Sequence, residues 1–500
     1  MTDAWTIALA DEAATIRLGS DLAPSLRAGD TVALHGGLGA GKTTLARAIV
    51  RAVAGQPALE VPSPTFTLVQ TYALDRVDIA HFDLYRIEHG EEVAELGLDD
   101  ALETGVALIE WPERLDDLAP DRLDITLEED GPDRRLARLV GHGAWSARLD
   151  RLRRLEAFLE TAGWGGCRRR FLQGDASSRR YERIDRDGRH AVLMDMPRRP
   201  DGPPIRGGRP YSAIAHLAES AGPFVAIAGA LRDLGLSAPE IFAADPDDGF
   251  LVIEDLGDAV YERMVADGAD MDGPYAAAVD VLAALRRTAG IACAGSWRLP
   301  SYDREALAVE AGLVPDWLWP QVHGEPAPAD ARSAFTAAWD DLFAIAEAGE
   351  RIWTLRDYHS PNLVWLPERP GLARVGLLDF QDALLGHPAY DLVSLLQDAR
   401  VDVSTGRETA MVRRYCDRAA ADGAFDEPAF RAAYAVLGAQ RASKILGIFV
   451  RLARRDGKTG YLRHIPRVSR YLERNLAHPA LAGLRAWYDR HLPAPVRERT

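Results

Sequence analysis

The sequence predicts two domains of different classes, an α/β domain followed by an α+β domain of two lobes. The length of 500 residues exceeds the usual size of a single domain. Residues 1–140 alternate short β-rich runs with helical stretches, which is typical of a parallel sheet covered by helices on both faces. A second strand-rich stretch then precedes a mostly helical remainder, which indicates a small β-rich lobe and a larger helical lobe.

The domain boundary is predicted at the Gly-rich join "GHGAWSARLD". This divides the chain into residues 1–145 and 146–500. Within the second domain, the strand-like pieces "RRRFLQ", "RYERIDR" and "HAVLMDM" begin an N-terminal lobe over about 165–257, and the C-terminal lobe covers about 258–500.

The composition indicates an ordinary soluble protein, with 47% hydrophobic and 27% charged residues. The net charge of −16 excludes a protein whose whole surface binds nucleic acid, although a local basic patch could still do so. Cys167, Cys293 and Cys416 lie far apart without metal-binding spacing, which favours reduced thiols. The early acids of "MTDAWTIALADEAA" do not fit a signal peptide, and no apolar run reaches the roughly 18 residues of a membrane span. We therefore expect a cytoplasmic protein without membrane association.

The first domain contains a phosphate-binding loop, "GGLGAGKT", which matches G-x-x-x-x-G-K-[ST]. The strand "DTVALHG" precedes it and the helical "KTTLARAIVRAV" follows, which is the context that such a loop requires. Glycines let backbone amides converge on phosphate oxygens, a lysine reaches the outer phosphates, and a hydroxyl binds Mg²⁺. The residues predicted to bind ATP are Gly36, Gly39, Gly41, Lys42, Thr43 and Thr44, with Thr43 also a Mg²⁺ ligand.

Two acids end apolar strands in the same domain. Asp83 in "HFDLYR" stands where an acid on the Mg²⁺ side belongs, and Glu110 in "IEWPE" could position water. Taken alone, each acid is more often a loop residue. Together with the phosphate-binding loop, they favour a P-loop NTPase site.

The motifs "GGLGAGKTT", "SPTFTLV", "HFDLYR" and "IEWPERL" occur in the order and spacing of the TsaE family, which this part of the chain resembles. The resemblance implies a small ATPase that assists N6-threonylcarbamoyladenosine formation on tRNA, with TsaB-like and TsaD-like partners and tRNA only indirectly. It assigns Glu110 and Trp111 to the ATPase centre and makes residues 63–65 a switch-like loop. Gly37 departs from the family, since many members have Asp there. A nucleotide-dependent interaction module is the alternative.

The second domain contains "LRDYHSPNLVW", a D-x-H-x-x-N pattern, followed by "LLDFQDA". Asp357 is placed to accept a proton from a substrate hydroxyl, and Asn362 and Asp379 are placed to hold Mg²⁺. Phosphoryl transfer needs a positioned hydroxyl, bound metal ions and a carboxylate near the nucleophile. His359 is expected to hold the loop by hydrogen bonding rather than to act as a base.

This domain resembles the protein-kinase-like aminoglycoside-phosphotransferase family, and more narrowly the AmgK group of anomeric amino-sugar kinases. "GDASSRRYER", "FLVIEDLGD", "LRDYHSPNL" and "LLDFQDALLGHPAYDLVSLLQD" carry the likeness. It implies that Asp357 is the catalytic base and that the substrate is an amino sugar, N-acetylmuramate or N-acetylglucosamine, in cell-wall recycling. The alternative is another small hydroxyl substrate of the aminoglycoside, choline or homoserine class. The implied ATP-binding residues are Gly174, Ser177 and Arg180 over the phosphates and Glu254 and Leu256 at the adenine hinge.

The strand "HAVLMDM" has no lysine where such kinases place the one that contacts the α- and β-phosphates, and the position is expected to be Met194. Arg179, Arg180 and Arg183 are candidate replacements. The alternative is that they are surface arginines and that Mg²⁺ alone anchors the phosphates. Further along, Arg441, Lys444 and Arg451 share one face of a helix. They form either a solvated or acid-paired face or a site near an anionic substrate.

Overall fold

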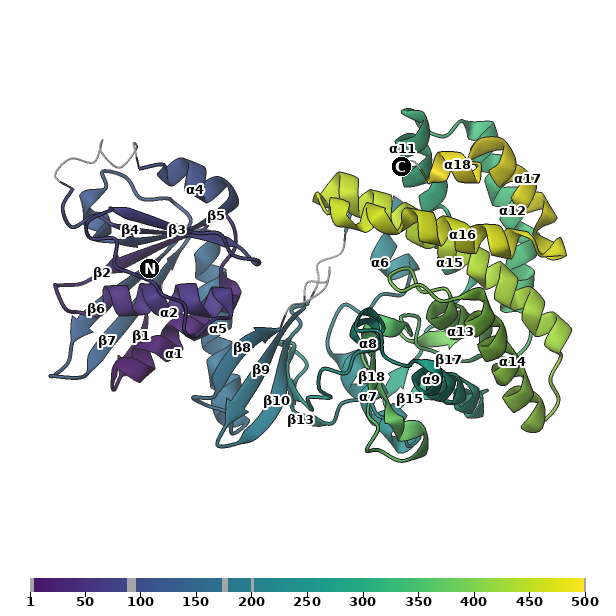
Figure 1. The fold of residues 1–500 in the computed structure, drawn as a ribbon, viewed down its shortest axis with the longest axis horizontal. Coiled ribbons are helices and arrows are strands. Elements are labelled where there is room, and N and C mark those ends of the chain that lie inside the picture. Colours follow the sequence, from purple (N-terminus) through teal and green to yellow (C-terminus); the bar gives the residue numbers. More distant parts are fainter. Residues whose placement is uncertain (1–3, 88–95, 173–178, 199–201, 499–500) are drawn as a thin grey trace. The chain divides into compact units, whose positions relative to one another are not determined.

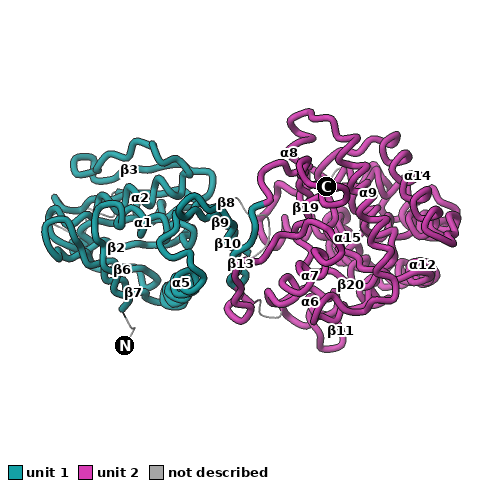
Figure 2. Tube along the Cα trace, turned by 90° about the horizontal axis from the view of Figure 1, so that it is seen from below, with its two compact units in different colours: residues 1–196, 250–255 teal, residues 197–249, 256–500 magenta. Residues whose placement is uncertain are grey.

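The computed structural model forms two compact units (Figure 2). The described residues are 4–87, 96–172, 179–198 and 202–498. Unit 1 comprises residues 1–196 and 250–255, and unit 2 comprises residues 197–249 and 256–500. Among the helices of the described residues, none has the length and apolar character that crossing a membrane would require.

Unit 1 begins with a seven-stranded sheet in the order β1-β7-β6-β2-β5-β4-β3 (Figure 1). Its strands are β1 (Trp5–Leu9), β2 (Thr31–His35), β3 (Val69–Tyr72), β4 (Asp78–Asp83), β5 (Gly105–Glu110), β6 (Arg122–Glu129) and β7 (Arg135–His142). β6, β2, β5 and β4 run parallel, whereas β1, β7 and β3 pair antiparallel. The sheet predicted to be parallel is therefore mixed. The β3–β4 and β6–β7 connections are too short for the crossover that parallel pairing needs.

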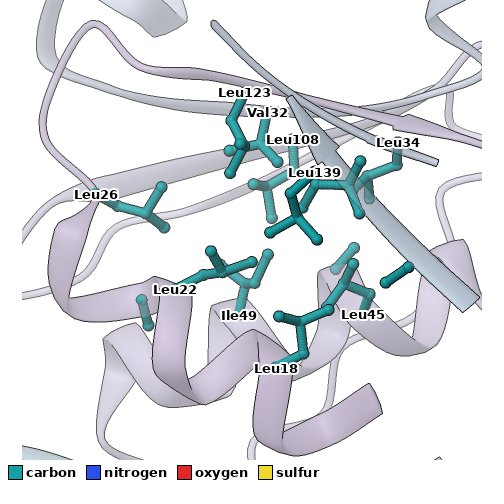
Figure 3. Packing of buried hydrophobic residues seen from close by; sticks show 14 of the residues in the cluster. Leu18, Leu22, Leu26, Val32, Leu34, Leu45, Ile49, Leu108, Leu123 and Leu139 are labelled. Atoms are coloured by element: carbon teal, nitrogen blue, oxygen red, sulfur yellow. The ribbon is translucent and has the colours of Figure 1, made fainter. Parts of the chain in front are cut away.

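Helices cover both faces of this sheet, as predicted. They are α1 (Glu12–Leu22), η1 (Ala23–Ser25), α2 (Lys42–Ala54), α4 (Leu98–Thr104), η2 (Pro112–Arg114) and α5 (Ala144–Thr161). On one face, leucines of α1 and Leu45 and Ile49 of α2 pack against Leu108 of β5 (Figure 3). On the other face, Phe82 and Ile109 pack with residues of α4. Alternate residues of β4 and β5 thus enter two different cores, which explains their nearly continuous apolar sequence.

Unit 1 also contains four antiparallel strands from the predicted N-terminal lobe, which we call the first-lobe sheet. These strands are β8 (Arg168–Leu172), β9 (Arg180–Arg186), β10 (Arg189–Asp195) and β14 (Phe250–Ile253). Their order is β14-β10-β9-β8. The predicted domain boundary of 145/146 falls in the first turn of helix α5. The boundary itself stays a prediction. Trp145, Leu149 and Leu152 of α5 belong to the core of the seven-stranded sheet.

Unit 2 is mostly helical, with short β-ladders that frame its loops. Its helices are α6 (Tyr211–Ile214), α7 (Gly222–Asp233), α8 (Tyr261–Ala266), α9 (Asp272–Leu285), η3 (Arg286–Thr288), α10 (Arg304–Ala311), η4 (Val314–Leu318), α11 (Trp319–His323), α12 (Ala329–Glu347), η5 (Ser360–Asn362), η6 (Gly371–Arg374), α13 (Ala389–Leu396), α14 (Thr405–Ala421), α15 (Glu427–Asp456), η7 (Thr459–His464), α16 (Ile465–Leu476), η8 (Pro479–Leu481), α17 (Ala482–His491) and α18 (Ala494–Arg497). Its strands are β11 (Pro204–Arg206), β12 (Arg209–Pro210), β13 (Ile241–Asp245), β15 (Cys293–Ala294), β16 (Trp297–Arg298), β17 (Ile352–Thr354), β18 (Leu363–Trp365), β19 (Val375–Leu377) and β20 (Leu384–Gly386).

The long helix α15 organises this unit. It packs against α10, α12, α13 and α16. Asp426 caps its start by accepting a hydrogen bond from the Ala429 amide at 3.0 Å, and Gly457 ends it in the left-handed region with φ of 68°.

A buried guanidinium lies among three carboxylates in unit 1. The Arg169 side chain is only 2% exposed, and its Nε donates to Glu182 at 2.8 Å. Its Nη1 lies 2.6 Å from Glu156 of α5 and 3.7 Å from Asp21 of α1. Burial raises the pKa of Asp21 to about 8, against the opposing charge of Arg169, and also raises the pKa of Glu156. The cluster therefore holds a proton at neutral pH.

This proton makes the stability of unit 1 depend on pH. Folded Asp21 keeps the proton up to about pH 8, whereas the unfolded chain loses it near its usual value of 3.8. We therefore expect the stability to fall as the pH rises from about 4 to about 8. The slope should be on the order of 0.5–1 kcal/mol per pH unit, less than the full linkage value because 27% of the side chain is exposed. Hydrogen exchange of α1 and β8 amides, corrected for intrinsic rates, measures it.

Asp21→Asn should flatten this dependence, because the amide is neutral at every pH and nearly isosteric. Glu12→Gln, an exposed substitution on the same helix, serves as the matched control and should keep the wild-type slope. An unchanged slope in Asp21→Asn would contradict the assignment of the proton to this cluster.

Candidate active sites

The first site lies where three parallel strands of unit 1 end. Glu110, the last residue of β5, pairs in register with Asp83 of β4 and Leu34 of β2. Carboxyl ends of parallel strands meet at one edge of a sheet, so both acids lie beside the loop that follows β2. Asp83 and Glu110 are both buried there. The structure therefore brings together the two acids and the loop that the sequence predicted.

The loop between β2 and α2 depends on its glycines. Gly36, Gly39 and Gly41 have φ values of 136°, 78° and 106°, a region that side chains other than glycine rarely adopt. A Cβ atom at Gly36 would lie 2.5 Å from the carbonyl oxygen of Leu127. This close packing and the following helix N-terminus fit a loop whose backbone amides receive phosphate. Thr44 lies in the first turn of α2.

Lys42 is held inside this loop. Its Nζ donates to the carbonyl oxygens of Gly36 at 2.7 Å and Gly37 at 2.8 Å. The same ammonium lies 3.7 Å from the centre of the Trp111 ring, a cation–π contact. Burial lowers the pKa of Lys42, and the negative charges of Glu110, Glu113 and Asp83 oppose this shift. Trp111, which the family resemblance placed at the ATPase centre, thus touches the phosphate-binding lysine.

Glu110 connects the loop to a histidine that sequence reasoning missed. Thr43 Oγ1 donates to Glu110 Oε2 at 3.0 Å, and His81 Nε2 lies 2.9 Å from Glu110 Oε1. His81 is fully buried, and its Nδ1 has no hydrogen-bond partner among the residues that the structure describes. Its signal was present in "HFDLYR", because His81 and Asp83 are two residues apart on β4 and share a face.

Asp83 is tied to the predicted switch-like loop. Thr65 Oγ1 donates to Asp83 Oδ2 at 2.7 Å, and Ser63 Oγ lies 2.8 Å from Thr65 Oγ1. A threonine hydroxyl at residue 43 and two strand-end carboxylates are oxygen donors that Mg²⁺ prefers. These residues fit a Mg²⁺ ion that would neutralise phosphate charge when bound, with Thr43 and Asp83 as the residues to hold it.

Replacing Glu110 by Gln should lower ATP turnover of the N-terminal domain by about 10²-fold or more, because the amide cannot act as a base toward water. Glu103→Gln, an exposed change on α4, is the control and should leave turnover unchanged. Steady-state ATP hydrolysis, measured with TsaB-like and TsaD-like proteins present, decides the outcome. Wild-type turnover in Glu110→Gln would remove Glu110 from the chemistry.

The second site is built by a hairpin in unit 2. Antiparallel β18 and β19 pair Leu363 with Leu377, which brings Asn362 and Asp379 to the same end of the ladder. Asn362 Nδ2 lies 3.4 Å from Asp379 Oδ2 and donates to the carbonyl oxygen of Asp357 at 2.9 Å. The three residues predicted from "LRDYHSPNLVW" and "LLDFQDA" therefore lie together. An amide and a carboxylate this close fit a Mg²⁺ ion that would neutralise phosphate charge when bound, with Asn362 and Asp379 as the residues to hold it.

Backbone contacts hold the loop that carries Asp357. Asp391 of α13 accepts hydrogen bonds from the amides of Leu355 at 2.6 Å and Arg356 at 2.9 Å. Arg356 has a φ of 68°, an uncommon conformation for a residue with a side chain, and these bonds stabilise it. Sequence reasoning missed Asp391, although it lies in the quoted "HPAYDLVSLL" segment.

His359 has the loop-holding position that was predicted. Its Nε2 lies 3.2 Å from Asn362 Nδ2, and its Nδ1 lies 3.9 Å from Asp398. Burial lowers the pKa of His359, so the imidazole is neutral at pH 7 and can accept from the Asn362 amide. The Ser360 amide donates to Asp398 at 2.9 Å, which fixes the following turn.

A buried charge network surrounds Asp357. Glu310, which is fully buried, forms ion pairs with Arg356 and with Lys444 Nζ at 2.7 Å. Burial would raise the pKa of the Asp357 carboxyl, but the positive charges of His359 in its protonated form, of Lys444 and of Arg356 outweigh it and lower that pKa. Asp357 is therefore ionised at neutral pH, as a proton acceptor must be.

On the basic face of α15, Lys444 is paired with an acid, which is part of the first of the two predicted alternatives. Lys444 pairs with Glu310, and Arg441 Nη2 donates to Ser394 at 2.7 Å in a buried position. Arg451 lies over the Tyr211 ring at 4.9 Å. A role for these residues toward an anionic substrate stays a prediction.

The residues implied for ATP in the kinase domain are only partly described. Gly174 and Ser177 lie outside the described residues. Of the predicted adenine hinge, Glu254 belongs to unit 1 and Leu256 belongs to unit 2. The division between the two units therefore falls within the predicted hinge.

The predicted replacements for the missing lysine have separate partners. Met194 is fully buried on β10. Arg183 Nε donates to Asp255 at 2.7 Å, and Arg180 Nε donates to Asp195 at 3.1 Å. The hydrogen bond of Arg180 to Asp195 does not support an ATP-binding role for this arginine. That role stays a prediction.

Taken together, the two sites define a chain with one P-loop ATPase domain and one kinase-like phosphotransferase domain. Residues 9–137 match the model of the "Threonylcarbamoyl adenosine biosynthesis protein TsaE" family, and residues 168–434 match that of the "Phosphotransferase enzyme family". The chain belongs to the phosphotransferase enzyme family, fused to an N-terminal domain of the TsaE family.

Curated relatives match each part separately. An N-acetylmuramate/N-acetylglucosamine kinase of Caulobacter vibrioides is 44% identical over 68% of this chain and 96% of its own length. A protein of the same name from Pseudomonas aeruginosa is 35% identical over 64% of this chain and 89% of its own length. A tRNA threonylcarbamoyladenosine biosynthesis protein TsaE of Rickettsia felis is 38% identical over 28% of this chain and 83% of its own length.

Proposed function

We propose that the chain is a bifunctional protein. Its N-terminal domain hydrolyses ATP in support of N6-threonylcarbamoyladenosine modification of tRNA. Its C-terminal domain transfers the γ-phosphoryl group of ATP to the anomeric hydroxyl of N-acetylmuramate or N-acetylglucosamine, in peptidoglycan recycling. The observation that carries the kinase assignment is the contact of Asn362 with both Asp379 and the Asp357 backbone.

The phosphotransfer follows from this geometry. The Asp357 carboxylate accepts the proton of the anomeric hydroxyl while the hydroxyl oxygen attacks the γ-phosphorus, and ADP leaves. Asn362 and Asp379 would hold the Mg²⁺ ion. The 44% identity to a kinase of this name over nearly its whole length supports an amino sugar as the acceptor.

The N-terminal activity depends on partners. Neither matched family is the transferase that modifies tRNA, so we propose that TsaB-like and TsaD-like proteins supply the modification chemistry and contact the tRNA. Thr43, Asp83 and Glu110 would bind Mg²⁺ and position water at the P-loop. We also propose that both activities take place in the cytoplasm, where ATP, tRNA and recycled amino sugars occur together.

The two chemistries should separate by mutation. Lys42→Ala removes the charge that the P-loop offers to phosphate, so ATP turnover by the N-terminal domain should be lost while sugar phosphorylation continues. Asp357→Asn should lower sugar phosphorylation by about 10²–10⁴-fold and leave the N-terminal turnover unchanged. ADP release without sugar and phosphosugar formation with sugar report on the two sites. Loss of both activities in folded Lys42→Ala would refute the two-site reading.

The product should be a sugar 1-phosphate. Transfer to the anomeric hydroxyl places phosphorus three bonds from the anomeric proton, so phosphorus NMR should show coupling to that proton. N-acetylmuramate and N-acetylglucosamine are the acceptors to test, with kanamycin and choline as comparison acceptors. A 6-phosphate product, or turnover only with a comparison acceptor, would contradict the proposed substrate.

A further inference from the structure

The first-lobe sheet has one face on which three of the four charged residues are buried and the fourth, Arg180, is half-buried. Alternation along strands and the observed register assign residues to faces: Phe171 pairs with Glu182, Arg180 with Asp195, and Asp195 with Phe250. Arg169 lies two residues before Phe171 and shares its face. We call this the docking face. Its members are Arg169, Phe171, Arg180, Glu182, Ile184, Ala191, Leu193, Asp195, Phe250 and Val252.

Elements of the N-terminal domain meet the β8 and β9 part of the docking face. Arg169 Nη1 lies 3.7 Å from Asp21 of α1. Arg180 Nη1 lies 3.4 Å from the Ser25 hydroxyl of η1. The Arg76 guanidinium, which donates to the carbonyl oxygen of Leu26 at 3.1 Å, lies 5.3 Å from the Phe171 ring centre.

Helix α5 covers the β10 and β14 part. Arg151 Nε donates to Asp195 at 3.0 Å, and its guanidinium lies 4.4 Å from the Phe250 ring centre. The Phe158 and Phe250 rings are 5.8 Å apart. The first half of this helix is anchored in the core of the seven-stranded sheet through Trp145 and Leu149. Helix α5 therefore packs both in the core of the seven-stranded sheet and against the first-lobe sheet.

The burial pattern indicates that this contact is permanent. Residues 191–195 of β10 are all buried, although antiparallel sheets commonly leave one face in water. Three charged residues of the docking face, Arg169, Glu182 and Asp195, are buried as well. Their partners include Asp21 of α1 and Glu156 and Arg151 of α5, the helix anchored in the core of the seven-stranded sheet. Pulling the sheet away from these two helices would leave buried charges without compensation.

We propose that α1, η1 and α5 form an intramolecular docking surface for the first-lobe sheet, so that the N-terminal domain is a structural part of the kinase. The sheet then unfolds and refolds with the ATPase domain, and sugar phosphorylation requires that domain to be folded. This does not require ATP turnover at the P-loop. Only the activity readout rests on the proposed kinase function. Figure 2 colours β8, β9 and β10 with the N-terminal elements of unit 1.

Hydrogen exchange of the full-length protein tests the docking directly. Leu108→Ala opens a cavity at a fully buried position of β5 in the N-terminal core. We expect exchange at least about tenfold faster in β2 and β5, and an equal acceleration in β8, β9 and β10, because one cooperative unit opens together. Wild-type rates in β8–β10 beside accelerated β2 and β5 would overturn the proposal.

A matched cavity in unit 2 provides the control. Leu446→Ala, at a fully buried position of α15, should accelerate exchange in α15 and leave β8–β10 within about twofold of wild type. If Leu446→Ala accelerates β8–β10 as much as Leu108→Ala does, the sheet follows unit 2 and the proposal is wrong. Should Leu108→Ala fail to fold, Leu108→Val makes a smaller cavity at the same position.

Thermal inactivation gives the functional readout. The rate at which sugar phosphorylation is lost at a fixed temperature should rise about tenfold in Leu108→Ala, in step with exchange in β2 and β5. Inactivation at the wild-type rate would overturn the functional part of the proposal. If no amino sugar is phosphorylated by the wild type, the proposed function fails, while hydrogen exchange still decides the docking.

Discussion

The buried Arg169 side chain is the contact on which unit 1 depends. It joins β8 to β9 through Glu182, to α5 through Glu156 and to α1 through Asp21. One guanidinium cannot balance three carboxylates, so the cluster keeps a proton, which reduces the excess negative charge. Burying these charged side chains costs free energy, and removing one partner while the others stay buried costs more. This explains why a sheet from the second sequence domain is part of the same compact unit as the first.

The two sites handle phosphate by different physical means. In the N-terminal domain, backbone conformation does most of the work: left-handed glycines shape the loop, and parallel register aligns Asp83 with Glu110. In the kinase domain, buried side chains hold the catalytic loop in place. Asp391 holds the backbone before Asp357, and Glu310 fixes Arg356 and Lys444.

The position of Arg180 shows how docking limits the roles open to a residue. Sequence alone placed it on a loop and strand over ATP, as one of several arginines that could replace the missing lysine. In the structure it shares a face with Asp195 and contacts η1, while Arg183 and Met194 lie on the opposite face. Alternation on β9 decides this, because residues three apart point to opposite faces.

Local patterns were sufficient for the P-loop, the strand-end acids and the D-x-H-x-x-N loop, because each motif is short and its chemistry depends on neighbours in sequence. The mixed sheet, the pairing of His81 with Glu110 and the support of Asp357 by Asp391 and Glu310 required the tertiary structure. These contacts join residues separated by 29 to 46 positions, and no local period encodes such a pairing. The sequence by itself determined which chemistry each domain carries. Only the fold decided which buried charges meet, because burial and charge compensation are properties of packed elements.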